Sequence, residues 1–167
     1  MNFVFFVDNP SFVIFVDELM RTLAIDLGVR RVGLALSDEG GRFATPHEVL
    51  EVNSAEAALV PILALIKKEN VQRILLGLPL NMDDSLGPAA QKTIQWSRKL
   101  ASESHLPILF VDERLSSFEA EQQLTDRKRA GEKLTRSRKK RQLDALAAAN
   151  LLQAFLDGKL PPIDLNR

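Results

Sequence analysis

The sequence has no cysteine, few histidines and no long apolar run. The lack of cysteine among 167 residues excludes disulfides, zinc–thiolate centres and cysteine nucleophiles, and it agrees with a cytoplasmic protein. Because no run of about 18 apolar residues occurs, we expect no membrane span and no membrane partner. The two histidines, His47 and His105, each lie beside a predicted helix or strand boundary, so we assign catalysis to neither.

Charge is distributed unevenly, although the formal net charge is zero. Residues 127–141 hold nine Lys or Arg and one acid, so this segment carries +8 and the rest of the chain −8. Blocks of like charge are often interaction segments, and we expect this one to bind a polyanion such as nucleic acid. A solvated loop that binds nothing is the alternative. The residues expected to bind are Arg138, Lys139, Lys140 and Arg141.

The N-terminal 19 residues repeat a short apolar pattern, FVFFVD at 3–8 and FVIFVD at 12–17. Asn-Pro-Ser separates the two copies, which predicts two strands around a turn. We expect residues 1–19 to be an appendage outside the core, and Met20 offers an alternative start. Residues 20–160 then form one domain, and 161–167 form a C-terminal tail.

Periodicity and turn signals predict an α/β fold with a five-stranded mixed sheet. Three strands in succession should form an antiparallel meander, whereas strands that alternate with helices should be parallel. We therefore expect one mixed sheet with helices on both of its faces. The expected strands are 23–27, 32–37, about 48–52, 73–78 and 107–111, and the expected helices are 54–70, 88–104, one from Ser116, and 138–156.

Asp26 is an acid inside an apolar strand. Leu23, Ile25 and Leu27 share one face of that strand, so Asp26 points to the other. A carboxylate in such a place is destabilising unless it is paired or bound to a metal. A salt bridge to one of the next two arginines along the chain is the alternative.

Asp144 begins the apolar stripe of the last predicted helix. At about 100° per residue, Ala148, Leu151 and Phe155 lie on the same face as Asp144, so this carboxylate should face the sheet. The alternative is an acid in the first helical turn, where the helix dipole favours negative charge.

Asp112 and Glu113 follow the last predicted strand. As neighbours they point to opposite faces, and their spacing does not choose between them. Inward acids from two strand ends and a helix are the oxygen ligands that Mg²⁺ or Mn²⁺ prefers. Two such ions can activate a water and stabilise the leaving oxygen in phosphodiester cleavage, with no nucleophilic side chain.

Several separated segments, in order, resemble the YqgF (RuvX) family of Holliday junction resolvases, also described as pre-16S ribosomal RNA nucleases. The resemblance covers about residues 20–157. It implies an RNase H-like fold, a divalent metal, and catalytic acids at Asp26, Glu113 and Asp144, which favours Glu113 over Asp112. The matching segments are DLGVRRVGLA at 26–35, ATP at 44–46, GLPLNMD at 77–83, DERLSSFEA at 112–120 and KKRQLDALAA at 139–148. Asp84 departs from the family, which usually has glycine there.

Further polar residues of these motifs are expected to contact nucleic acid. Arg30 and Arg31 could hold a phosphate, Asn81 could contact the substrate or order the site, and Arg114 could pair with the scissile phosphate as a planar fork; local loop structure is the alternative for each.

The sequence thus predicts a metal-dependent endonuclease that cuts Holliday-junction DNA, which would require a homodimer. Maturation of pre-16S ribosomal RNA is the alternative within the same chemistry, and a non-catalytic nucleic-acid-binding factor is the alternative of another class.

Overall fold

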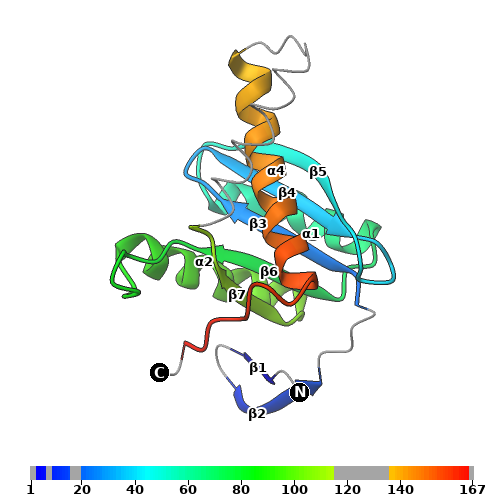
Figure 1. The fold of residues 1–167 in the computed structure, drawn as a ribbon, viewed down its shortest axis with the longest axis vertical. Helices are drawn as coiled ribbons and strands as arrows, with labels where there is room; N and C mark the ends of the chain where they lie inside the picture. Colours follow the sequence, from blue (N-terminus) through cyan, green and yellow to red (C-terminus); the bar gives the residue numbers. More distant parts are fainter. Residues whose placement is uncertain (1–2, 7–8, 16–19, 115–135, 166–167) are drawn as a thin grey trace.

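The fold is a five-stranded sheet covered by helices on both faces (Figure 1). This computed structural model describes residues 3–6, 9–15, 20–114 and 136–165, with side chains for 20–114 and 143–165. The strands lie in the order β5-β4-β3-β6-β7. β3 (Thr22–Leu27), β4 (Arg31–Ser37) and β5 (Ala44–Glu51) form the antiparallel meander, and β6 (Arg73–Leu78) and β7 (Ile108–Asp112) run parallel to β3. The predicted mixed sheet is therefore confirmed.

β5 begins earlier than expected, at Ala44 rather than near Glu48. Pro46 lacks a backbone N–H, and proline is therefore disfavoured inside central strands. β5 is an edge strand, however, where a proline is tolerated, and its pairing with β4 shifts register beside Pro46. The sequence pattern could not reveal which strand would lie at the edge.

In the described part of the chain, two α-helices and a short 3-10 turn cover one face of the sheet. The predicted helix at 54–70 is split into a short 3-10 turn, η1 (Glu56–Ala58), and α1 (Leu59–Lys68). α2 (Pro88–Ser104) has the predicted bounds, with Pro88 in its first turn. The core on this face contains the side chains of Leu23, Ile25, Leu34, Ile62, Ile74, Leu76, Leu100 and Phe110.

The long helix α4 (Arg136–Leu156) covers the other face. Its buried residues pack against the alternate residues of the strands, including Ala24, Ala35, Leu75 and Val111. The C-terminal half of α4 crosses the sheet, whereas its first turns extend beyond the sheet (Figure 1). The helix expected from Ser116 lies outside the described residues.

The described segments nearest the two ends of the chain lie close to β7 (Figure 1). β1 (Phe3–Phe6) and β2 (Asn9–Phe15) form the predicted antiparallel pair, as a separate two-stranded sheet. At the other end, the Ile163 backbone N–H donates to the Phe110 carbonyl of β7. Among the residues that the structure describes, no helix has the length and apolar character needed to cross a membrane.

Candidate active site

The predicted acids gather at one end of the sheet because three of its strands are parallel. β3, β6 and β7 run in the same direction, so their carboxyl ends meet at one edge. Asp26 is the penultimate residue of β3, and Asp112 is the last residue of β7. Leu78, the last residue of β6, pairs with Asp112, and its carbonyl accepts a hydrogen bond from the Glu113 N–H. Parallel pairing thus brings residues more than 80 positions apart to one edge.

A glycine on β4 brings Asp144 to the same edge. Gly33 lies directly opposite Asp26 in the β3–β4 pair. A Cβ atom added to Gly33 would overlap the backbone carbonyl of Asp144, so only glycine allows α4 to lie this close to the strand. Asp144 is the ninth residue of α4 and not part of its first turn. The first-turn alternative for Asp144 is therefore wrong.

The strand faces distinguish Glu113 from Asp112. Leu109 and Val111 pack on the α4 side of the sheet, whereas Phe110 packs on the α1–α2 side. Glu113 lies two positions after Val111, so it continues the alternation on the α4 side of the sheet. A Cβ atom added to Gly77 of β6 would lie 3.1 Å from Glu113 Oε2 and 3.2 Å from Leu151 of α4. Glu113 therefore shares the face of Asp26 and Asp144.

Burial and mutual repulsion perturb two of these acids. Burial, with repulsion from Asp144, raises the pKa of Asp26 to about 6. Burial, followed by repulsion from Asp26 and then Asp112, raises the pKa of Glu113 to about 7. Groups with such shifts cluster at functional sites. The site is therefore a concentration of negative charge that favours a cation.

One internal cation already pairs with Asp144. Arg31 Nε lies 2.5 Å from Asp144 Oδ2, and both side chains are about a quarter exposed. The salt bridge considered for Asp26 thus forms on Asp144 instead. No ion pair to Asp26 occurs among the side chains that the structure describes.

The sequence profile of one family matches most of the chain. This profile, RuvX, described as Holliday junction resolvase, matches residues 20–158. The chain belongs to the RuvX family. The suspected family is confirmed, and the match begins one residue after the proposed appendage ends.

Curated relatives support the assignment to RuvX. A Syntrophomonas wolfei protein named "Putative pre-16S rRNA nuclease" is 40% identical over 139 residues, which are 83% of this chain and 95% of that protein. A Mesorhizobium japonicum protein of the same name is 43% identical over 138 residues, 82% of this chain and 80% of the relative. The family and its relatives bear the names of nucleases, so this RuvX protein is an enzyme of that class.

A solved structure shows the same fold. RuvC from Thermus thermophilus, in complex with Holliday junction substrate, superposes with a TM-score of 0.52 and 16% identity, covering 86% of this chain and 99% of RuvC. At this identity the likeness concerns the fold alone. It confirms the RNase H-like architecture.

The donor set of this RuvX site suits a hard divalent cation. Asp26, Glu113 and Asp144 offer only carboxylate oxygens, and two of them have raised pKa values that a cation would lower again. Among the described side chains, no three acidic or histidine groups already form a ready-made metal cluster. Arg31 Nε contacts Asp144 Oδ2, an oxygen that a metal ion would need.

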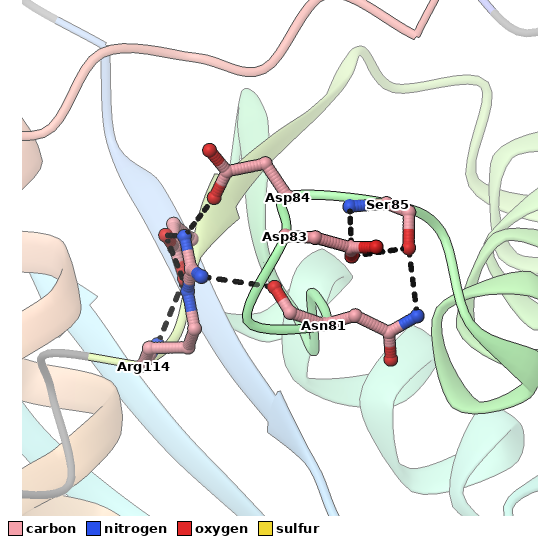
Figure 2. Close-up of polar contacts among 6 residues, drawn as sticks. Asn81, Asp83, Asp84, Ser85 and Arg114 are labelled. Atoms are coloured by element: carbon pink, nitrogen blue, oxygen red, sulfur yellow. Dashed lines mark hydrogen bonds and ion pairs between the residues drawn. The ribbon is translucent and has the colours of Figure 1, made fainter.

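Residues 79–87 form the loop that follows β6, and Figure 2 shows part of this loop in detail. Asn81 donates from Nδ2 to Ser85 Oγ, and its backbone N–H donates to the Ser85 carbonyl. The Asn81 amide also packs where a Cβ on Gly87 would lie, 2.6 Å from Asn81 Oδ1. Asp83 accepts hydrogen bonds from Ser85 N and Oγ. These contacts order the loop.

The structure places Arg114 in contact with two carboxylates. Its guanidinium binds Asp112 and Asp84, a pairing that the sequence pattern did not reveal for Asp84. Arg30 is exposed in the turn between β3 and β4. Arg138, Lys139, Lys140 and Arg141 lie in the first turns of α4, and their side chains are outside the described part of the chain.

Proposed function

We propose that this RuvX protein is a divalent-metal-dependent endonuclease whose catalytic acids are Asp26, Glu113 and Asp144. The observation that supports this most is their convergence: three separate elements place one acid each at the same edge of the sheet. A bound Mg²⁺ or Mn²⁺, in a one- or two-ion site, would supply Lewis acidity and an activated water for phosphodiester hydrolysis.

The site's own residues would position the carboxylates that hold the ions. Gly33 lets α4 approach so that Asp144 joins Asp26, and Gly77 leaves room for Glu113. Burial keeps Asp26 and Glu113 poorly solvated, so both carboxylates gain more from a cation than exposed acids would. Arg31 compensates the charge of Asp144, and its guanidinium would be available to a phosphate oxygen if Asp144 held a metal ion instead.

Two substrates are consistent with this chemistry, and each rests on one finding. The family description names Holliday junctions, whose resolution requires two active sites related by symmetry and hence a homodimer. The curated relatives are named for pre-16S ribosomal RNA, whose maturation a monomer can perform. In both cases the binding partner is nucleic acid, and Arg30, Asn81, Arg114 and the Arg138–Arg141 segment are the proposed contacts.

The test compares cleavage of both substrates under matched conditions. Labelled four-way junction DNA and precursor 16S RNA are incubated with the protein in Mg²⁺, Mn²⁺ or EDTA, beside Asp26→Asn. Glu39→Gln is the matched control, because Glu39 is exposed and follows β4 at the opposite end of the sheet. We expect cleavage to require metal, to be lost in Asp26→Asn and to be retained in the control.

The outcomes separate the metal site from the substrate. Cleavage that persists in EDTA or in Asp26→Asn would show that the metal site is wrongly assigned. Cutting of the junction alone, by a dimer in sedimentation analysis, would select the resolvase. Cutting of the RNA alone, by a monomer, would select ribosomal RNA maturation.

A further inference from the structure

Arg114 is the centre of a polar network that joins the ends of β6 and β7 (Figure 2). Its Nε contacts both Asp112 oxygens, at 3.0 and 2.9 Å. Its Nη2 lies 2.6 Å from Asp112 Oδ2 and also 2.6 Å from Asp84 Oδ1. Its Nη1 donates to the Asn81 carbonyl at 2.9 Å. A guanidinium has five N–H groups, and these contacts engage all three nitrogens.

The two carboxylates on Arg114 are held very differently. Asp112 is bound through two nitrogens and also accepts from the Arg114 backbone N–H, and its side chain is 23% exposed. Asp84 makes a single contact with Arg114, and its side chain is 76% exposed. An exposed ion pair of this kind contributes little stability. Asp84 is therefore the partner that is easily displaced.

The backbone of Asp84 is also in an unfavourable conformation. Its φ angle of 64° lies in the left-handed region, where glycine is favoured over other residues. The Asp84 carboxylate points at Arg114, whereas the carboxylate of the neighbouring Asp83 points at Ser85 (Figure 2). A residue type that the backbone does not favour thus supplies the second negative charge on the guanidinium.

Two carboxylates on one guanidinium leave the group with a net negative charge. This charge lies next to Glu113, at the edge of the sheet where the nucleic acid would approach. An arginine in this state repels a phosphate, whereas an arginine paired only with Asp112 still offers N–H donors to one. The Asp84 carboxylate thus controls whether Arg114 can bind a phosphate of a polyanion.

We propose that Asp84 is an affinity-determining residue that acts through Arg114. A phosphodiester oxygen of the nucleic acid takes the place of the Asp84 carboxylate on Nη2, so each binding event must first separate Asp84 from Arg114. The inference rests on the proposed nucleic-acid function of the site. Asp84 does not contact the reacting groups, so it acts on binding and not on the chemical step.

The experiment measures the Kd of four-way junction DNA and of precursor 16S RNA, in EDTA and at fixed salt. Asp84→Asn keeps a side chain that tolerates the left-handed region, and Asp84→Gly removes the side chain. We expect both variants to bind about two- to fivefold more tightly than the unchanged protein, as displacement of an exposed ion pair implies. With metal, KM should fall by a similar factor while kcat stays constant.

The control is Asp83→Asn, which removes the same charge from the same loop. Its amide oxygen can still accept from Ser85, and its side chain does not contact Arg114. We expect a clearly smaller change in Kd than for Asp84→Asn. Equal gains in the two variants would reduce Asp84 to a general repulsive charge and overturn the proposal.

The second arm repeats Asp84→Asn in an Arg114→Gln background. The gain in affinity should disappear there, because no guanidinium remains to be released. If circular dichroism shows that Arg114→Gln is unfolded, Arg114→Lys replaces it, and the gain should shrink because lysine lacks the fork. A gain that persists in full refutes the proposal. If the unchanged protein binds neither nucleic acid, the proposed function fails and this inference fails with it.

Discussion

Glu113→Gln should stabilise the metal-free protein at pH 8 but not near pH 4.5. The pKa of Glu113 is about 7 in the folded protein, against an ordinary value of 4.5. The folded state holds the Glu113 proton more tightly than the unfolded state does. The contribution of Glu113 to the free energy of unfolding is therefore fully present below pH 4.5 and is lost as the pH rises through 7. Each pKa unit is worth about 1.4 kcal/mol, so the rise from 4.5 to about 7 gives a loss of at most about 3.5 kcal/mol.

Glutamine cannot ionise, so the variant avoids this loss. We expect the free energy of unfolding of Glu113→Gln, relative to the unchanged protein, to rise by about 1–3 kcal/mol between pH 4.5 and pH 8. Urea unfolding in EDTA at several pH values measures it. The comparison across pH isolates the charge, because any packing change from the amide is the same at each pH.

The neighbouring acid supplies a control of opposite sign. The hydrogen bond from Arg114 lowers the pKa of Asp112, so Asp112 contributes stability above its unfolded pKa that is lost as pH falls. Asp112→Asn should therefore be less stable than the unchanged protein at pH 8, and the difference should narrow toward low pH. A Glu113→Gln difference that is constant with pH, or that follows the trend of Asp112→Asn, would refute the electrostatic account of the site.

Three further perturbations test the packing and the charge of the fold. Gly33→Ala should lower the free energy of unfolding by about 1–3 kcal/mol, because the new methyl group overlaps the Asp144 carbonyl. The same overlap should weaken Mn²⁺ binding, which calorimetry measures. An unchanged metal affinity would count against the close approach of α4. The buried Arg73 contacts Phe155 and Thr22, and its Nη1 has no partner among the described atoms. Thermal melts should therefore show Arg73→Met to be at least as stable as Arg73→Ala, and the reverse order would mean that the aliphatic stem of Arg73 does not contribute through packing. Neutralising residues 139–141 should flatten the salt dependence of nucleic-acid binding, and an unchanged slope would remove this segment from the interface.

Local patterns predicted the parts of the site that depend on a single element. Strand alternation predicted that Asp26 points away from the apolar face of its strand, and helical periodicity predicted that Asp144 lies on the side of its helix that faces the sheet. Both follow from the repeat of one element and need no knowledge of neighbours.

The remaining features depend on which elements meet. Alternation could not choose between Asp112 and Glu113, because the choice depends on which face of the sheet α4 covers. The partner of Arg31 was missed for a related reason: Arg31 begins β4 and contacts Asp144, a residue 113 positions away. Asp84 stood out in the sequence only as a departure from the family's glycine, and its contact with Arg114 required the arrangement of two loops.

Helix α4 carries both a proposed catalytic residue and the proposed nucleic-acid-binding residues on one continuous helix. Residues 138–141 precede Asp144 by three to six positions, which is roughly 4.5–9 Å along a helix. With an axial rise of about 3.4 Å per nucleotide of one strand in duplex DNA, that length corresponds to roughly one to three nucleotides along the duplex axis. Helix geometry therefore fixes how far from the scissile bond the backbone is held. One inserted residue within this stretch would rotate the basic residues by about 100° around the helix axis, although it would leave every acid of the site in its place.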